Sequence, residues 1–195
     1  MKRAFVIAME SEAEAVRPAL RPEDKLYVCG IGKVYAAAAT QKAISEFGAE
    51  EVVNCGLCGA FGDDVEVGDV FGVESAVEYD FDLAVVNNTS IGVKDGETSP
   101  YVPVASGGGF PLRRLATADR FNDNESDVAL IKSFGCTMRD MEGAAVAGVC
   151  AANGVRCVMF KCVSDVHGRG TMTGQYLVNR EKALKCLSRA AISLT

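Results

Sequence analysis

Three carboxylates in this sequence stand where an apolar segment meets a polar turn: Glu12, Glu142 and Asp165. A carboxylate that is partly buried needs hydrogen bonds, either from the protein or from the hydroxyl groups of a ligand. Apolar walls also raise the pKa of an acid toward the range that suits proton transfer. The chemistry that these residues could support is therefore proton transfer combined with the binding of hydroxyl groups.

Each of these acids also has an ordinary structural explanation. Acids favour the first turn of a helix because of the helix dipole, and Ser164-Asp165 is common capping chemistry. Glu142 stands out, because the helix that it opens, predicted over 141–153, is apolar on most of its faces. A carboxylate at that position needs partners of its own or a ligand.

Several other chemistries are poorly supported by the sequence. Gly30-Ile31-Gly32 follows an apolar run, but Tyr35 stands where a dinucleotide-binding fingerprint has its third glycine. Neither a G-x-x-x-x-G-K-[ST] phosphate loop nor a G-x-S-x-G nucleophile elbow occurs. A histidine-dependent triad would rest on His167 alone, the one histidine, which lies in a polar loop and which we expect to be solvated or structural.

The eight cysteines mostly lie inside apolar segments, which predicts buried, reduced thiols. Cys55 and Cys58 form an isolated C-x-x-C pair. With no second pair and a single histidine, zinc binding is poorly supported, and we expect no metal. A redox function remains an alternative, and it requires an exposed thiol of low pKa in the 55–58 segment.

The order of elements indicates an α/β protein with a largely parallel sheet. Ligands in such folds bind beyond the carboxyl ends of the strands, which is where the three acids stand. The stretch 56–62 reads as a glycine-rich turn, and 87–111 is the least ordered-looking part. Strands are predicted at 3–9, 25–30, 51–55 and 155–163, further extended segments at 69–79, 114–118 and 135–139, and helices at 10–20, 34–47, 141–153 and 178–194.

Length and charge narrow the classes of partner. The 195 residues suit one domain, which we place at 1–195, and 49% of them are hydrophobic, as in an ordinary globular protein. The net charge is −6, without a dense Lys/Arg run, so we expect no nucleic acid partner. No apolar stretch is long enough to span a bilayer, and the run 4–9 ends at Glu10 without a cleavage site. We therefore expect a cytoplasmic protein without a membrane partner.

Several short motifs in register resemble the nucleoside phosphorylase/nucleosidase superfamily, and most of all its 5′-methylthioadenosine/S-adenosylhomocysteine nucleosidases. None of them is decisive alone, but they occur in the order of the family, from residue 4 to about residue 166. The matching pieces are Ala8-Met9-Glu10-Ser11-Glu12, Gly30-Ile31-Gly32-Lys33-Val34, Val53-Asn54-Cys55-Gly56-Leu57-Cys58-Gly59, Val67-Gly68-Asp69-Val70, Ala118-Asp119-Arg120-Phe121, Asp140-Met141-Glu142-Gly143-Ala144-Ala145 and Ser164-Asp165-Val166.

The resemblance implies a single-domain, three-layer α/β/α fold with a mixed, partly parallel central sheet. It implies hydrolysis of the N-glycosidic bond of a 5′-modified adenosine, with release of the free base. Asp165 would protonate the purine, Ser164 would hold that aspartate, and Glu12 would activate the attacking water, which is the arrangement of an inverting glycosidase. The resemblance implies no metal or organic cofactor, and it implies a homodimer, since relatives commonly form one. The implied substrate-binding residues are Met9, Phe121, Asn122, Asp140, Met141, Glu142 and Ser164.

Three alternatives stay open. Futalosine hydrolases share the fold and the glycosidic chemistry but take a bulkier, carboxylated 5′ group, which Lys161 or Arg169 could face. A phosphorylase would carry an arginine where this chain has Glu12, so the carboxylate favours water over phosphate. A catalytically silent nucleoside-binding protein is the third alternative, because Leu57 and Lys161 depart from the pattern of the family.

The lining of the 5′ pocket is a further expectation. The segment 83–113 is shorter than in the family, and it lacks the aromatic residues that line this pocket there. The residues available for that lining are Tyr79, Phe81, Tyr101 and Phe110.

Overall fold

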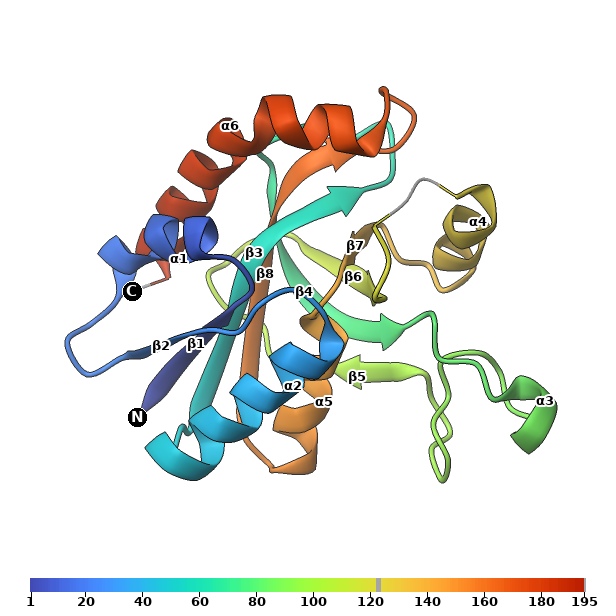
Figure 1. Ribbon diagram of the computed structural model, residues 1–195, viewed down its shortest axis with the longest axis horizontal. Helices are drawn as coiled ribbons and strands as arrows, with labels where there is room; N and C mark the ends of the chain where they lie inside the picture. The colour runs from blue at the N-terminus through green and yellow to red at the C-terminus, as the bar shows by residue number, and fades with distance from the viewer. Residues whose placement is uncertain (122–123, 195) are drawn as a thin grey trace.

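The computed structural model describes residues 1–121 and 124–194 (Figure 1). Its elements in chain order are β1 (Arg3–Ile7), α1 (Glu10–Val16) with a 3₁₀ turn (Arg17–Ala19), β2 (Lys25–Val28), α2 (Lys33–Lys42) continued by a π-helical turn (Ala43–Phe47), β3 (Glu51–Ala60), β4 (Val70–Glu78), α3 (Ala84–Asn87), β5 (Tyr101–Pro103), β6 (Leu112–Thr117), α4 (Glu125–Ser133), β7 (Met138–Asp140), α5 (Gly143–Ala152), β8 (Arg156–Val166) and α6 (Met172–Ser193).

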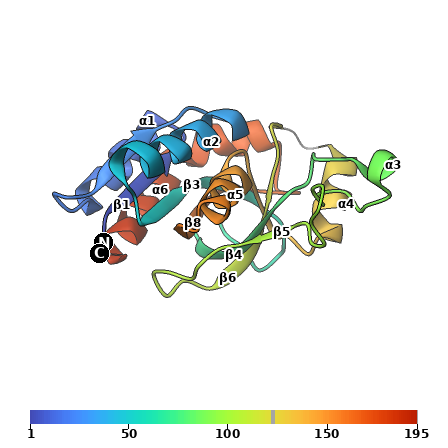
Figure 2. The ribbon, with the colours of Figure 1, turned by 90° about the horizontal axis from the view of Figure 1, so that it is seen from below.

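Helices cover both faces of the sheet, as Figures 1 and 2 show for α2 and α5 on one face and for α1 and α6 on the other. Ala4 and Val6 of β1 pack under α2 and α5, whereas Phe5 and Ile7 pack under α1 and α6. Because side chains alternate along a strand, a strand that is covered on both faces reads as one apolar run. The predicted three-layer fold with a mixed, partly parallel sheet is confirmed.

Across the described residues, eight strands form one sheet in the order β2-β1-β3-β7-β6-β4-β5, with β8 pairing to β3 and β4. β3 pairs in parallel with β1 and β8, and its last residues pair antiparallel with β7. β8 in turn pairs antiparallel with β4, β4 pairs in parallel with β6, and β6 with β7. The strands β3, β8, β4, β6 and β7 therefore form a closed ring, which the alternation of strand and helix did not predict.

The largest error of the sequence prediction lies in β3. The strand does not end at residue 55 but continues through the glycine-rich stretch to Ala60. Glycine is favoured in turns, which is why 56–62 read as one. In this strand, Gly56 and Gly59 instead allow other side chains to approach the backbone closely.

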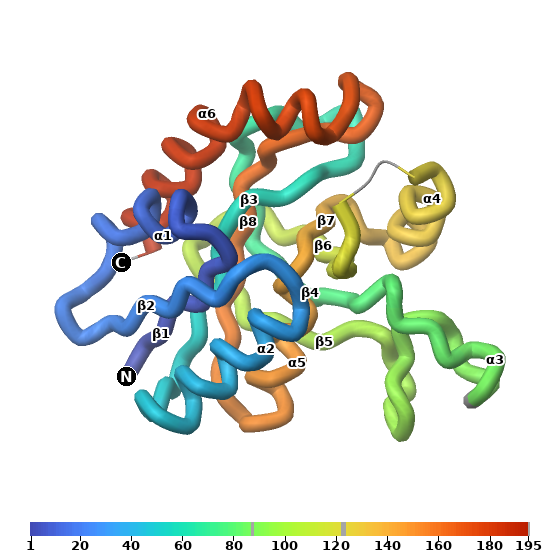
Figure 3. The backbone as a smooth tube through the Cα atoms, viewed as in Figure 1, coloured from blue at the N-terminus to red at the C-terminus, as the bar shows by residue number. Residues whose placement is uncertain are grey.

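The ends of other helices and strands also differ from the predicted ends, and some of these differences affect the site. α6 begins at Met172, six residues before the predicted start, and β8 extends to Val166. α4 occupies a segment for which no element was predicted. The segment around α3 lies apart from the helical layers in Figure 3. No helix among the described residues is both long enough and apolar enough to cross a membrane.

Candidate active site

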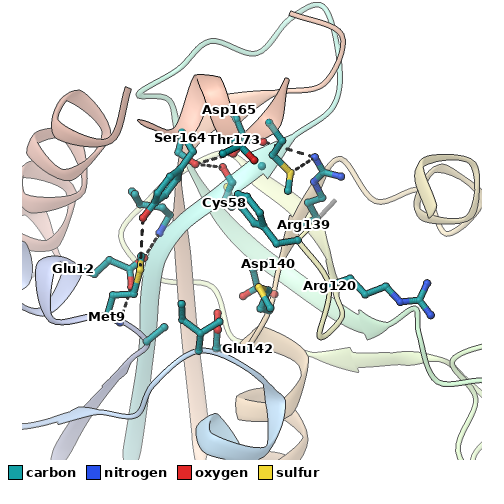
Figure 4. Close-up of a pocket in the computed structure, with 18 of the residues that line it drawn as sticks. Met9, Glu12, Cys58, Arg120, Arg139, Asp140, Glu142, Ser164, Asp165 and Thr173 are labelled. Carbon is teal, nitrogen blue, oxygen red and sulfur yellow. Dashed lines mark hydrogen bonds and ion pairs between the residues drawn. The ribbon is translucent and has the colours of Figure 1, made fainter. Parts of the chain in front are cut away.

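A pocket of about 480 Å³ opens at the carboxyl ends of β1, β3, β7 and β8, under the start of α6. It gathers the predicted residues Met9, Glu12, Phe121, Asp140, Met141, Glu142, Ser164 and Asp165. Figure 4 shows Ser164 and Asp165 on one side of this pocket, with Glu12 and Glu142 on the other. Asn122, also predicted to contact substrate, lies outside the described residues.

Glu12 is held in the first turn of α1 by two backbone groups. Its Oε2 accepts a hydrogen bond from the Met9 N–H at 3.1 Å, and its Oε1 accepts one from the Leu57 N–H at 2.8 Å. The residue is 3% exposed. Burial raises the pKa of Glu12, although these N–H donors and the charge of Lys161 oppose the rise. Glu12 is therefore a fixed carboxylate with proton affinity above that of a surface glutamate.

Glycines in β3 make room for both predicted catalytic carboxylates. A Cβ atom at Gly56 would lie 2.7 Å from Oε1 of Glu12. A Cβ atom at Gly59 would lie 2.8 Å from Oδ1 of Asp165 and 2.9 Å from Nε of Arg139. Real Cβ contacts are almost never that short, so any side chain at either position displaces the acid beside it.

We expect Gly56→Ala to lower turnover far more than it lowers stability. The new methyl group must push the Glu12 carboxylate away from Leu57, and misplacing a reacting group by about 1 Å can cost roughly a hundredfold in rate. Overpacking of this kind destabilises a protein by about 1–3 kcal/mol. The measurements are the steady-state rate of base release and the thermal midpoint.

Gly148→Ala is the matched control for this variant. Gly148 lies within α5, where a Cβ atom meets only Nζ of Lys94 at 3.7 Å, an ordinary contact distance. This control should keep both rate and stability. Normal turnover in the Gly56→Ala protein would contradict the role of Gly56 in seating Glu12.

Asp165 is positioned by an irregularity between β3 and β8. Cys58 pairs with Val163 and Gly59 pairs with Asp165, so Ser164 is the extra residue on β8. Such a bulge changes the direction of the side chains beside it. The Ser164 hydroxyl donates to Oδ2 of Asp165 at 2.9 Å and lies 3.2 Å from the Cys58 carbonyl oxygen. Both residues are 2% exposed, so Asp165 reaches the pocket with a fixed orientation.

Glu142 and Asp140 belong to a buried charge network around Lys161. Oε1 of Glu142 accepts the Gly32 N–H at 2.8 Å, which ties the start of α5 to the start of α2. Nζ of Lys161 lies 2.8 Å from Oδ2 of Asp140, and the Thr117 hydroxyl donates to Oδ1 at 2.6 Å. Burial alone would lower the pKa of Lys161, but Asp140, Glu142 and Glu12 raise it above its ordinary value. Lys161 is therefore the buried cation that balances this group of acids.

We expect the titration of Glu142 to make kcat/KM and the free energy of unfolding change in opposite directions as pH rises. Burial first, and then the charge of Asp140, raise the pKa of Glu142 to about 7. The unfolded state ionises near 4.5, so between these two pH values the folded state holds more protons and stability falls as pH rises. If the ionised form binds ribose hydroxyls, kcat/KM should instead fall as pH drops below about 7.

Thermal midpoints and kcat/KM measured from pH 5 to pH 8 test this expectation. Glu142→Gln should reduce the slope of stability against pH; some slope remains, because the pKa of Glu12 is raised too. An unchanged slope in that variant would contradict the assignment to Glu142.

The start of α6 supplies a wall of the pocket that the sequence prediction missed. Thr173, Tyr176 and Leu177 line it, and the Tyr176 ring meets the Phe121 ring edge-on at a centroid distance of 6.1 Å. The signal that could have located this wall is Thr171, whose hydroxyl oxygen accepts the Gly174 N–H at 3.2 Å as an N-cap. Phe121 is 51% exposed, so its ring borders the mouth of the pocket.

The aromatic residues expected to line the 5′ pocket do not reach this pocket. Tyr79 is buried under α4, and the Tyr101 ring packs edge-on against Phe134 at a centroid distance of 6.4 Å. Phe110 packs on Phe160 beneath α6. Their places along the chain gave no indication of the face of the sheet that each would join.

The two cations expected to face a carboxylated 5′ group are also placed elsewhere. Lys161 lies inside the acid network, and Arg169 pairs with Glu66 at 2.8 Å. Of the described cationic side chains, Arg120 and Arg139 are the ones that line the pocket. Arg120 also pairs with Asp127 at 2.9 Å.

The redox alternative is wrong. Cys55 and Cys58 are 1% and 3% exposed, and burial raises the pKa of both thiols, the opposite of what a reactive pair needs. All eight cysteines are free thiols. Within residues 1–121 and 124–194, no three His, Cys, Asp or Glu side chains gather in an arrangement that could hold a metal ion.

Comparison with known proteins assigns the family. The family model described as "Phosphorylase superfamily" matches residues 26–194. The chain belongs to the phosphorylase superfamily. The resemblance inferred from the motifs is confirmed.

Two curated proteins are similar to this chain in sequence. A 5′-methylthioadenosine/S-adenosylhomocysteine nucleosidase of Treponema pallidum is 31% identical over 203 residues, which cover 86% of this chain and 75% of the relative. An aminodeoxyfutalosine nucleosidase of Campylobacter jejuni is 33% identical over 150 residues, 71% of this chain and 66% of the relative. The chain therefore spans about two thirds to three quarters of the length of these relatives.

One solved structure shares the fold of this chain over the whole length of the chain. The 5′-methylthioadenosine/S-adenosylhomocysteine nucleosidase of Colwellia psychrerythraea, crystallised with adenine, has a TM-score of 0.87 at 24% identity. The match covers 100% of this chain and 96% of that one. At this identity the likeness establishes the common fold.

Proposed function

We propose that this protein is a purine nucleosidase that hydrolyses the N-glycosidic bond of 5′-modified adenosines of the methylthioadenosine/S-adenosylhomocysteine type. The products are the free base and the ribosyl moiety. The observation that carries the proposal is the meeting of Glu12, Glu142 and Asp165 in one pocket, with Glu12 and Asp165 on different sides of it. The name of the Treponema relative supports the same substrate class.

The proposed reaction divides the work between the two sides of the pocket. Asp165 gives a proton to the leaving purine, and Ser164 keeps that carboxyl group in place through its 2.9 Å hydrogen bond. Glu12 takes a proton from the water that attacks the opposite face of the sugar. Glu142 accepts hydrogen bonds from the ribose hydroxyls, which strengthen as positive charge develops on the sugar. Met141 packs under the ribose, and Phe121 packs on the base.

The charge around Glu12 supports hydrolysis over phosphorolysis. A phosphate dianion needs cationic donors, as in an arginine clamp. Glu12, Asp140 and Glu142 place carboxylates on that side of the pocket, and Lys161 is buried against Asp140. Water is therefore the nucleophile that this site favours.

A second candidate is a futalosine-type substrate, with a larger carboxylated 5′ group. The name of the Campylobacter relative supports it. Arg120 on the pocket lining is a cation that such a carboxylate could meet. The reaction and the roles of the acids are the same for both candidates.

An assay for released base tests the proposal. Methylthioadenosine, S-adenosylhomocysteine, adenosine, inosine and futalosine are offered first without phosphate and then with it. We expect release without phosphate, and the substrate that reacts identifies the 5′ group. Release that depends on phosphate would make the protein a phosphorylase. No release by folded protein that still binds adenine would favour a silent nucleoside-binding protein.

We also propose that the protein works as a cytoplasmic homodimer. Eight free thiols support a reducing compartment. Exposed apolar side chains beside the start of α2, Ile31, Val34 and Tyr35, support a protein contact at that place. Light scattering on the eluting protein gives the mass in solution, and a mass of one chain would reject the dimer.

A further inference from the structure

Arg139 places a buried positive charge beside the proposed general acid. Its Nη2 lies 3.8 Å from Oδ1 of Asp165, and the residue is 7% exposed. The guanidinium group lies over the ring of Phe61 at 5.2 Å from the ring centroid, and Nη2 also donates to the sulfur of Met172. Figure 4 shows Arg139 and Asp165 on the same side of the pocket. The cation is therefore fixed where the base would bind, away from the ribose side.

The proposed hydrolysis gives Arg139 no role beyond its ion pair with Asp165. Burying a guanidinium group is costly, and an apolar side chain would fill the space above Phe61 at lower cost. Gly59 leaves the room that both Arg139 and Asp165 occupy, since a Cβ atom there would clash with both. Because Arg139 lines the pocket, a ligand can reach it. Arg139 is therefore a charged hydrogen-bond donor on the pocket lining, beside Asp165.

The chemistry of purines identifies the atom that it would contact. In a purine nucleoside linked through N9, N7 is a ring nitrogen that can take the proton from Asp165, and the substituent at C6 lies on the same edge as N7. A donor beside Asp165 on the C6 side of N7 therefore faces this substituent. A guanidinium group only donates hydrogen bonds, through five N–H groups. A 6-oxo group accepts such bonds, whereas a 6-amino group presents its own hydrogens to them.

We propose that Arg139 selects the base, and that this enzyme takes 6-oxopurine nucleosides with at least the efficiency of the matching 6-aminopurine nucleosides. The inference rests on the proposed function and extends its range of bases from adenine to 6-oxopurines. When the glycosidic bond breaks, its electron pair passes into the ring, and in a 6-oxopurine part of that charge reaches O6. Arg139 stabilises this charge while Asp165 delivers the proton to N7.

Matched substrates test the proposal. The pair is 5′-methylthioinosine and 5′-methylthioadenosine, which differ only at C6, and the quantity is the ratio of their two kcat/KM values. In the unmodified protein this ratio should be one or more. In Arg139→Met it should fall by about tenfold to a hundredfold, the value of one hydrogen bond to a charged group. Arg139→Lys should keep part of the preference, because it retains a donor and the charge.

Arg113→Met is the matched control. Arg113 also lies over a phenylalanine ring, Phe71 at 5.1 Å, and also pairs with an aspartate, Asp64 at 2.9 Å, but it does not line the pocket. This variant should leave the ratio unchanged. A ratio below one in the unmodified protein, or an equal ratio before and after Arg139→Met, would overturn the proposal.

Binding of the free bases separates this inference from the proposed function. Calorimetry should give hypoxanthine an affinity at least equal to that of adenine, and Arg139→Met should reverse that order. Release of adenine from methylthioadenosine, with a ratio below one or a ratio that Arg139→Met leaves unchanged, would overturn the role of Arg139 alone. No release from either nucleoside would overturn the proposed function, and the affinity ratio of the bases would still decide the role of Arg139.

Discussion

Asp165→Asn is expected to reduce kcat by about 10²- to 10⁴-fold, the usual contribution of a positioned general acid. The amide has the shape of the carboxyl group, and its oxygen can still accept the Ser164 hydroxyl, which lies at 2.9 Å from Oδ2 in the native site. The fold and the binding of nucleoside should therefore persist. The measurements are the rate of base release, the thermal midpoint, and the affinity for a nucleoside with a non-hydrolysable linkage.

Asp64→Asn is the control for this substitution. Asp64 pairs with Arg113 at 2.9 Å and its side chain is 70% exposed, so the same chemical change is made outside the pocket. This control should keep the full rate. Near-native turnover in Asp165→Asn would remove Asp165 from the role of acid.

Glu12→Gln is expected to reduce kcat by a similar factor of about 10²- to 10⁴-fold, because it removes the base that activates water. Stability should fall as well, for a reason visible in the geometry. Both Glu12 carboxylate oxygens accept backbone N–H groups, from Met9 and from Leu57, but an amide has one acceptor oxygen. One N–H then faces the amide NH₂, and a buried donor left without its partner costs about 1–3 kcal/mol.

The measurements on this variant are base release, nucleoside affinity and the thermal midpoint. Glu10→Gln provides the control, since Glu10 is in the same helix and pairs with Arg17 on the surface at 3.0 Å. A Glu12→Gln protein that folds and binds nucleoside but does not turn it over would support the role of base. If it neither binds nor folds, the role of Glu12 is structural.

Much of the architecture could be predicted from local pattern. Apolar runs in the sequence predicted β1, β3 and β8, because a strand that is covered on both faces carries apolar side chains on both faces. Gly48 marked the end of the helical segment that begins with α2, and it does adopt a left-handed conformation with φ of 73°. These signals depend on neighbouring residues and therefore survive without knowledge of the fold.

The candidate site could be predicted to a similar degree, and for a related reason. Acids placed after strands must meet at one edge of a parallel sheet, and the order of the motifs added the family. Glu12, Glu142 and Asp165 do line one pocket, while their chemical roles stay predictions for the experiments above. Asn122 stays a prediction as well.

The type of most segments, the buried faces of the strands and the set of acids at the strand ends could all be read from the sequence. The partners of those acids depend on the fold. Glu12 bonds a backbone group 45 residues away, Glu142 bonds one 110 residues away, and Asp165 lies beside Arg139 because a bulge in β8 directs it there. This difference arises because hydrophobic periodicity reports burial within a single helix or strand. Distances between side chains of different elements depend on which strands pair and in what register.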